Sequence, residues 1–251
     1  YQYLADRGPF NREKIWYPYN PAESPAYIIP PITNISDGPS GLAYYPGTGL
    51  GEEYDRRFFL VDFRGQASNS GVRTFRSEPK GAFFEPVDDE KPIWQILATD
   101  IHFGADGQLY LLDWVHGWTG EGKGRIYRLF DQEAQQAPEV GEVYVLLNGG
   151  IAESNAEKLS ELTAHKDMRV RQEAQFELAR RGDVDALLQL ALEGVSTADD
   201  RYQQLSRLHG IWGCLQMYRQ KLQHPEFEIT ENDVQRIVNS LNILMTDDDD
   251  V

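Results

Sequence analysis

The chain has 251 residues, 41% of them hydrophobic, and a formal net charge of −16. This length and apolar content suffice for one large or two ordinary domains, and the acidity argues against nucleic acid or an anionic membrane as a partner, because both are bound through clustered Lys and Arg. No apolar run reaches the roughly 18 residues of a membrane helix, and the single cysteine, Cys214, excludes an internal disulfide, a thiolate zinc site and a Cys-x-x-Cys-His haem attachment. We predict that Cys214 is a buried helical residue.

The first third of the chain predicts irregular structure followed by an antiparallel sheet. Residues 1–31 are rich in proline and tyrosine, and their prolines exclude a helix interior or a central strand. The turn residues of Asp37–Gly41 then lead into runs typical of strands. Four strands are predicted, at Leu42–Tyr45, Arg57–Phe63, Gly71–Arg76 and Ala82–Val87.

Residues Thr99–Trp114 predict a β-hairpin. Asp100–Phe103 alternate polar and apolar side chains, and Gln108–Trp114 form a run rich in aliphatic and aromatic residues. The Asp-Gly pair at 106–107 is typical of a type I′ turn, in which both central residues adopt positive φ. We expect this hairpin to lie in a second sheet that runs from about Trp94 to Phe130.

The two sheets are predicted to be copies of one repeat. Phe59-Leu-Val-Asp-Phe63 matches Tyr110-Leu-Leu-Asp-Trp114 in residue type at every position, and Gly71–Phe75 matches Gly124–Arg128 downstream. A strand-rich unit that returns after roughly 40 to 50 residues is typical of the blades of a β-propeller. We therefore predict about two antiparallel four-stranded blades that do not close into a ring, because closure needs at least about four blades.

After Phe130 the pattern changes from strands to helices. A polar linker at Asp131–Pro138 precedes Glu142–Leu147, which fits a strand or a buried helix turn. Beyond it the period is helical, with Asp167 and Thr230 as expected N-caps and Gly182 as a helix stop. The predicted apolar faces are Leu159 and Leu162; Val170, Ala174 and Leu178; Val184, Leu187, Leu188 and Ala191; Leu205, Leu208, Ile211, Trp212, Leu215 and Tyr218; and Val234, Ile237, Val238, Leu241 and Leu244.

The helices also predict a repeat. Leu159-x-x-Leu162 followed by Asp167 returns as Leu241-x-x-Leu244 followed by Asp248, at about twice the roughly 40-residue period of HEAT-type helical hairpins. Such hairpins stack into a solenoid. The predicted fold is a β-propeller fragment over residues 1–135, followed by a truncated all-α HEAT-type solenoid over residues 136–251.

Several segments resemble a known family. They are Tyr3–Arg12, Ile35–Leu50, Phe59–Gly65, Thr99–Trp114 and Gly117–Arg128, and they are similar to the glucose/sorbosone dehydrogenase-like propellers of large bacterial secreted proteins. In that family HEAT repeats follow the propeller, and His165–Ala174 and Arg207–Gly213 resemble its helical part. A c-type cytochrome module often comes next. Both ends of the sequence look cut, so we expect the chain to be a fragment.

The resemblance implies a redox function. Sugar-oxidising relatives bind pyrroloquinoline quinone and calcium on the propeller axis and use a histidine base from an early blade. That blade is not in this chain, and the positions that match basic quinone contacts, near Leu97 and Thr99, are not basic. The implied protein is a periplasmic or secreted dehydrogenase for a sugar or alcohol, with the c-type haem module of the same parent chain as its electron acceptor and no cofactor within these residues.

Arg64 and Asp62 are the candidate cofactor contacts. Arg64 lies beside Gly65 at a strand end, close to where the relatives place a basic contact to the cofactor. Asp62 comes two residues earlier and is a natural ion-pair partner. The structural alternative is a solvated pair at the strand end, which contributes little to stability.

The glycine-rich loop Val115–Lys123 is the predicted functional surface. Within it His116 is the candidate catalytic residue, because histidine exchanges protons near neutral pH, and Trp118 is a candidate contact to a cofactor or sugar ring. The alternative is that the glycines merely make the loop flexible.

Asp100 and Asp113 are the candidate metal ligands. A carboxylate with nearby backbone carbonyls can ligate calcium, whereas the alternative is a hydrogen bond from each carboxylate to the backbone of the neighbouring turn. His209 and Trp212, one helical turn apart, are predicted to pack inside the solenoid.

Two classes of function remain open. One is the redox enzyme implied by the resemblance; the other is a non-catalytic scaffold whose propeller and solenoid surfaces bind proteins or glycans. A histidine with basic residues in further blades, and a haem-attachment motif after the solenoid, would favour the enzyme. For the chain alone we expect neither sugar oxidation nor haem binding.

Overall fold

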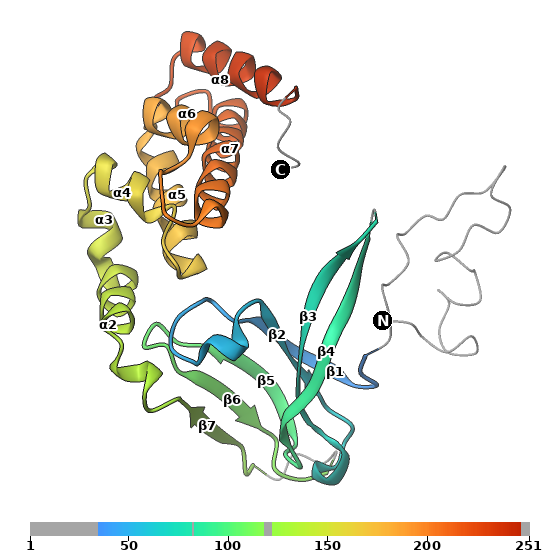
Figure 1. The fold of residues 1–251 in the computed structure, drawn as a ribbon. Coiled ribbons are helices and arrows are strands. Elements are labelled where there is room, and N and C mark those ends of the chain that lie inside the picture. Colours follow the sequence, from blue (N-terminus) through green and yellow to red (C-terminus); the bar gives the residue numbers. More distant parts are fainter. Residues whose placement is uncertain (1–34, 82, 118–121, 247–251) are drawn as a thin grey trace, which may run out of the picture. The chain divides into compact units, whose positions relative to one another are not determined.

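The computed structural model describes residues 35–81, 83–117 and 122–246. The chain divides into two compact units (Figure 1). The sheet unit contains the described residues up to Tyr45 together with Glu52–Phe103 and Leu109–Leu129. The helical unit begins at Phe130 and also includes two loops that lie between strands, Pro46–Gly51 and Gly104–Gln108.

The first sheet has four antiparallel strands in chain order. They are β1 (Pro39–Tyr44), β2 (Arg57–Asp62), β3 (Gly71–Lys80) and β4 (Phe83–Trp94). The predicted sheet is therefore confirmed, but β3 and β4 are longer than expected and form a ribbon (Figure 1). Trp94 ends this sheet and does not begin the next.

The second sheet contains the predicted hairpin. Its strands are β5 (Ala98–Phe103), β6 (Leu109–Asp113) and β7 (Arg125–Leu129), all antiparallel. A four-stranded sheet was expected, and this is wrong for the described residues, which supply three strands. The two sheets of the described residues do not together close into a ring, as predicted.

The turn between β5 and β6 is not of type I′. Gly107 has a φ of 75°, whereas the φ of Asp106 is not positive, as a type I′ turn would require. The Gly107 amide donates to Gly104 O at 3.0 Å, and the Gly104 amide donates to Gln108 O at 2.9 Å. This is a three-residue loop that ends in a left-handed glycine. The Asp106 carboxylate, which accepts from the Gln108 amide at 3.1 Å, favours this geometry over the tighter turn.

The two sheets pack face to face inside the sheet unit. Phe103 of β5 lies 5.4 Å from Phe59 of β2, ring centre to ring centre, in an edge-to-face arrangement, and 5.6 Å from Tyr45. Val61 and Leu111 are fully buried. One apolar layer between the sheets therefore forms the core of this unit.

The helical unit is built from consecutive helices. They are α2 (Pro138–Val145), α3 (Ile151–Glu153), α4 (Ala156–Leu162), α5 (Met168–Arg181), α6 (Val184–Glu193), α7 (Asp200–Gln223) and α8 (Glu231–Leu244). The ambiguous run at Glu142–Leu147 is helical: it spans the end of α2 and the start of a π-type turn, Leu146–Gly150. No helix among the described residues is long and apolar enough to cross a membrane.

The predicted helix ends are confirmed. Asp167 accepts a hydrogen bond from the Arg169 amide at 2.9 Å, Gly182 ends α5 in the left-handed region, and Thr230 opens α8 with a capping box that includes Asp233. Local capping chemistry thus sets the boundaries of these helices.

The buried face of α7 differs from the predicted one. Trp212 and Leu215 are 47% and 36% exposed, although Trp212 packs edge-on against the buried His209. A Cβ on Gly210 would lie 2.3 Å from Ala191 N, so small residues are needed where α7 approaches α6. The buried face consists of Ser206, His209, Gly210, Gly213, Cys214 and Met217.

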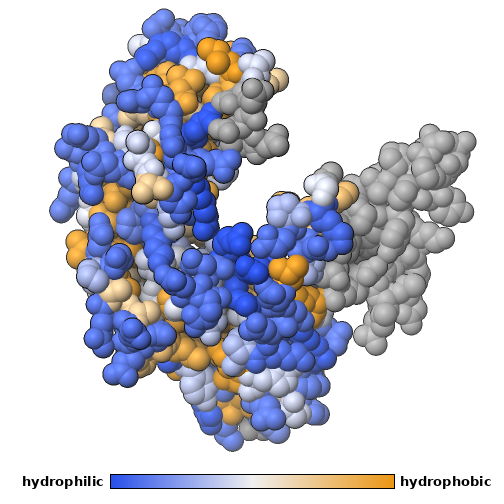
Figure 2. Space-filling model, in the orientation of Figure 1, coloured by the Kyte–Doolittle hydropathy of each residue, from blue (hydrophilic) through white to orange (hydrophobic). Residues whose placement is uncertain are grey.

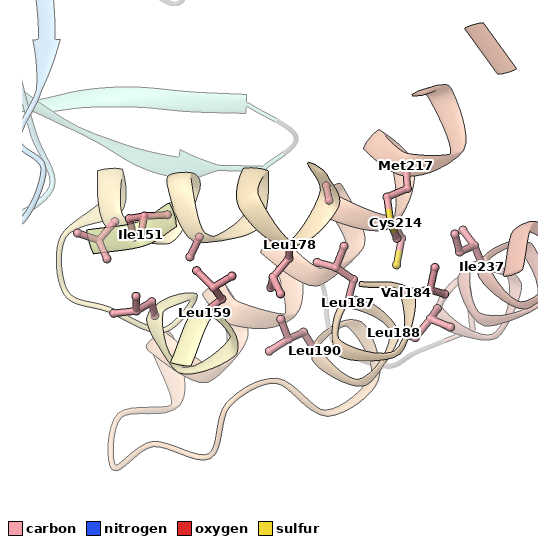
Figure 3. Packing of buried hydrophobic residues seen from close by; sticks show 14 of the residues in the cluster. Ile151, Leu159, Leu178, Val184, Leu187, Leu188, Leu190, Cys214, Met217 and Ile237 are labelled. Atoms are coloured by element: carbon pink, nitrogen blue, oxygen red, sulfur yellow. The ribbon is translucent and has the colours of Figure 1, made fainter. Parts of the chain in front are cut away.

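The core of the helical unit joins all the longer helices (Figure 3). Leu159, Leu178, Leu187 and Ile237 are fully buried within one cluster. Cys214 belongs to the same cluster, and burial raises the pKa of its thiol to about 12. The prediction that this cysteine is a buried helical residue is confirmed.

Candidate functional site

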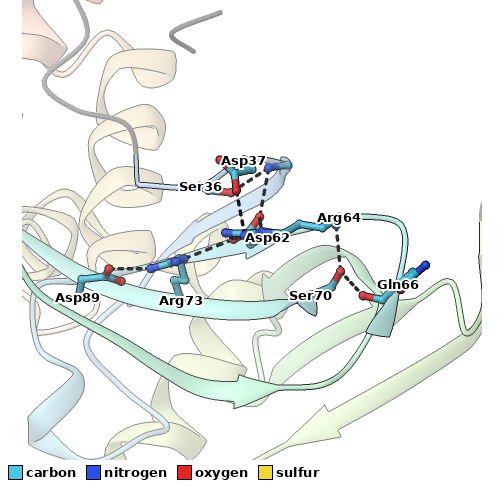
Figure 4. A network of polar contacts seen from close by, with 9 residues as sticks. Ser36, Asp37, Asp62, Arg64, Gln66, Ser70, Arg73 and Asp89 are labelled. Atoms are coloured by element: carbon cyan, nitrogen blue, oxygen red, sulfur yellow. Dashed lines mark hydrogen bonds and ion pairs between the residues drawn. The ribbon is translucent and has the colours of Figure 1, made fainter. Parts of the chain in front are cut away.

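Asp62 stands at the centre of a polar network at the end of β2 (Figure 4). Its side chain is fully buried and accepts from Arg64 Nη2 at 2.7 Å, Arg73 Nε at 3.4 Å and the Gly38 amide at 3.1 Å. Arg64 also pairs with Asp37 at 2.8 Å, and Arg73 with Asp89 at 2.6 Å. One carboxylate thus ties together the segment before β1, the end of β2, and β3.

This network keeps Asp62 ionised. Burial by itself raises the pKa of Asp62, but the hydrogen bonds from Arg64, Ser36 and the Gly38 amide outweigh it and hold the pKa below its usual value. The hydrogen bond to Asp62 in turn raises the pKa of Arg64. The structure therefore brings the two predicted cofactor contacts together, in an ion pair whose carboxylate is buried and not solvated. Each guanidinium already bridges two carboxylates.

Asp100 and Asp113 lie on opposite faces of the second sheet. Asp100 pairs with Leu112 in the register, and Leu112 and Asp113 are consecutive, so their side chains alternate. Asp100 accepts from the Ile101 amide at 2.8 Å, and Asp113 from the Val115 amide at 2.9 Å. Within the described ranges no cluster of three or more His, Cys, Asp or Glu side chains is arranged to hold a metal ion.

The loop after β6 begins with an unusual backbone. Val115 has a φ of 77°, and the His116 amide donates to Trp114 O at 3.1 Å, which closes a turn around Val115. A β-branched residue is strained in this region. His116 is exposed at the start of the loop, and Trp118, the other predicted residue here, lies outside the described residues.

The helical unit contains a site that the sequence did not predict. A groove of about 790 Å³ runs between α4, α6 and α8. Its lining includes the apolar residues Ala156, Val184, Ala186, Leu190 and Val195. Figure 2 shows that most of the visible face of the helical unit is hydrophilic.

Acidic side chains dominate the lining of this groove, which we call the acidic groove. Among the described residues that line it are the carboxylates Glu157, Glu161, Asp183, Asp185 and Asp233, against one basic residue, Arg236. Arg236 pairs with Asp185 and lies 3.1 Å from Asp233. Lys158 lies 3.3 Å from Glu161. The described part of the chain supplies no ion-pair partner to Glu157 or Asp183, so the groove keeps an excess of negative charge.

Sequence reasoning missed these residues because three separated helices contribute them. Glu157 and Glu161 are four positions apart and so share a face of α4, which is visible in the sequence. That α8 brings Asp233 and Arg236 to the same place depends on packing around Ile237.

Comparisons with known proteins give no assignment: no protein-family model, no curated protein and no solved structure matches the chain. The function is therefore inferred from the residues described above.

Proposed function

We propose that the chain is a non-catalytic scaffold whose acidic groove binds a basic segment of another protein. The observation that carries the proposal is the excess of carboxylates around an apolar lining, in a groove large enough for several side chains. An extended Lys- or Arg-rich segment would place its aliphatic stems on Val184 and Leu190 and its charged ends beside the carboxylates.

Glu157 and Asp183 are the expected anchors of this segment. Neither is neutralised by a described cation, and Asp183 precedes α6 without capping it through its side chain. Their field adds to that of the whole chain, whose net charge is −16, so basic partners are attracted at long range. The binding should weaken as salt is added, because exposed charges are screened within about 8–10 Å at physiological ionic strength.

Four of the residues predicted for redox chemistry have partners within the chain, which favours the scaffold over the enzyme. Asp62 and Arg64 bind each other, and Asp100 and Asp113 each accept from a backbone amide. The sugar- or alcohol-oxidising activity implied by the family resemblance, with its quinone, calcium and c-type haem partner, stays a prediction, as does a periplasmic or secreted location.

The finer description of the fold belongs to the same proposal. We take the two sheets as neighbouring blades of a β-propeller because they carry one repeat and stack through their faces. We take the helices as HEAT-type hairpins because consecutive helices pack on one another around a continuous core. The resemblance to sorbosone dehydrogenase-like propellers with HEAT repeats supports both assignments.

Peptide binding tests the groove. A fluorescently labelled nona-arginine peptide should bind with an affinity that falls as salt rises, and the triple variant Glu157→Gln/Glu161→Gln/Asp183→Asn should bind about 10-fold more weakly, at about 0.5 kcal/mol for each charge removed. Fluorescence anisotropy measures both affinities.

The matched control removes the same charge elsewhere in the helical unit. Glu139, Glu153 and Glu173 are exposed and do not line the groove. Their replacement by Gln should change the affinity less than 3-fold. Equal losses in the two triple variants would show that the peptide responds to net charge alone and would refute the groove as the binding site.

A further inference from the structure

His209 lies at the contact between α5 and α7, where it is 6% exposed. Its Nδ1 atom lies 2.8 Å from Gln175 Oε1, and the Gln175 side-chain nitrogen donates to Gln216 Oε1 at 3.3 Å. Because that nitrogen points at Gln216, the Gln175 oxygen faces His209 as an acceptor, and Nδ1 of the neutral ring carries the hydrogen. One side chain of α5 thus bonds to two side chains of α7.

The surroundings of His209 suit a neutral ring. Trp212 packs edge-on against it, with 5.2 Å between the ring centres. The charged side chain that acts on it from α5 is Arg171, which is 7% exposed and donates to the carbonyl oxygens of His165 and Lys166. A positive charge on the ring would therefore be buried near another positive charge, and burial and repulsion both oppose ionisation.

The contact between α7 and α6 leaves little room for the ring to reach water by a shift of α7 toward α6. A Cβ on Gly210 would lie 2.3 Å from Ala191 N, and a Cβ on Gly213 would lie 2.5 Å from Leu187 Cδ2. At this contact α6 contributes the Ala191 backbone and the apolar Leu187 side chain. An ionised ring therefore gains water where α7 separates from α5.

We propose that His209 makes the contact between α5 and α7 sensitive to mild acid. The neutral ring holds the two helices together through Gln175. A proton taken from water by Nε2, the nitrogen that carries no hydrogen in the neutral ring, ionises His209, and the contact then opens so that water can solvate the charge. Acid should therefore loosen the helical unit without any other ligand.

The pH range follows from the two states of the ring. Burial, with a smaller effect from Arg171, lowers the pKa of His209 in the folded chain to about 4, whereas an unfolded chain has a histidine pKa of about 6.5. The unfolded chain thus binds the proton more tightly. The stabilising contribution of the neutral ring is complete above about pH 6.5 and is lost as the pH falls from there to about 4.

Urea unfolding, followed by the circular dichroism of the helices, tests this proposal. Between about pH 7.5 and about pH 5, the folding equilibrium constant of the intact chain should fall about 30-fold more than that of His209→Gln, as the two pKa values require. Burial also lowers the pKa of His165, but His165 is present in both chains and cancels in the comparison.

His224→Gln is the matched control. His224 follows the last residue of the same helix, is exposed and lies 3.4 Å from Glu226. Its replacement should leave the pH dependence of the intact chain unchanged within about 3-fold, because an exposed ring is solvated in both protonation states. An intact chain and His209→Gln with the same pH dependence would overturn the proposal.

NMR of the intact chain gives a second measurement that needs no folded variant. At about pH 5.5 the ¹⁵N shifts of the His209 ring should show a neutral imidazole with its hydrogen on Nδ1, although an exposed histidine is mostly ionised at that pH. A ring protonated on both nitrogens, or on Nε2 alone, would refute the proposed contact. None of these results depends on the acidic groove, so this proposal and the proposed function fail separately.

Discussion

Strands β2 and β6 carry the same sequence pattern in different surroundings. Both are the second strand of their sheet and both end in an aspartate, Asp62 or Asp113. Asp62 is fully buried and bound by Arg64, Arg73 and the Gly38 amide, whereas Asp113 accepts from the Val115 amide. The comparison teaches that the repeat specifies strand pairing, while the flanking residues decide what each aspartate does.

The same contrast holds for the apolar residues of the strands. Phe59 is 2% exposed against the second sheet, and its counterpart Tyr110 is only half-buried on a face that no described sheet covers. Equivalent positions should therefore contribute unequally to stability. The same substitution made at both positions of a pair measures the difference in unfolding free energy between the two copies of the repeat.

Core truncation should give the largest difference. Phe59→Ala should destabilise the sheet unit by about 3–4 kcal/mol, because it leaves a cavity in a closed layer, and Tyr110→Ala by about 1 kcal/mol. Urea unfolding followed by tryptophan fluorescence, at a concentration below any self-association, measures both. Equal losses would show that Tyr110 is as well covered as Phe59 and would cancel the contrast between strands β2 and β6.

The aspartates should give the next largest difference. Asp62→Asn should cost about 2–3 kcal/mol at pH 7, because two arginines lose a carboxylate inside a buried network, and Asp113→Asn about 1 kcal/mol for one backbone contact. Urea midpoints at pH 7 provide the comparison. Similar costs would mean that the two strand ends are equivalent after all.

Acid adds a second measurement on Asp62. Its pKa is lower in the folded chain than in the unfolded chain, so its stabilising contribution is complete above the unfolded value of about 3.9 and is lost as the pH falls through the folded value. The difference in unfolding free energy between the intact chain and Asp62→Asn should therefore be constant from pH 7 to about 5 and shrink below pH 4. A difference that shrinks near pH 6 would point to another titrating group.

Much of the fold was predictable because its determinants are local. The strands around Phe59 and Tyr110 follow from apolar runs between turn residues, and the helix ends at Asp167, Gly182 and Thr230 follow from capping chemistry. The face of α7 did not follow, because hydrophobic periodicity favours large residues and this contact needs small ones.

The candidate sites were less predictable because their partners are distant in the sequence. Arg64 and Asp62 are near neighbours and were paired from sequence, but Arg73 joins them from β3 and removes the solvated alternative. The acidic groove is formed by α4, α6 and α8 together, and no short-range sequence pattern predicts that these helices pack side by side. Charge clusters built across elements become visible only when packing is known.

The smallest expected effect concerns the residue that follows Phe59–Phe63 in the first repeat and Tyr110–Trp114 in the second. Val115 occupies the position that Arg64 holds in the first repeat, but only Val115 has a left-handed backbone. Val115→Gly should relieve about 1–3 kcal/mol of strain and give back about 0.5–1 kcal/mol through the freer unfolded chain, for a net gain of about 1 kcal/mol. Val115→Ala is the control, since alanine is also disfavoured at positive φ and should leave stability within about 0.5 kcal/mol. The urea midpoints of the three proteins give the ranking, and a loss of stability in Val115→Gly would show that the valine side chain stabilises this turn more than its backbone strains it.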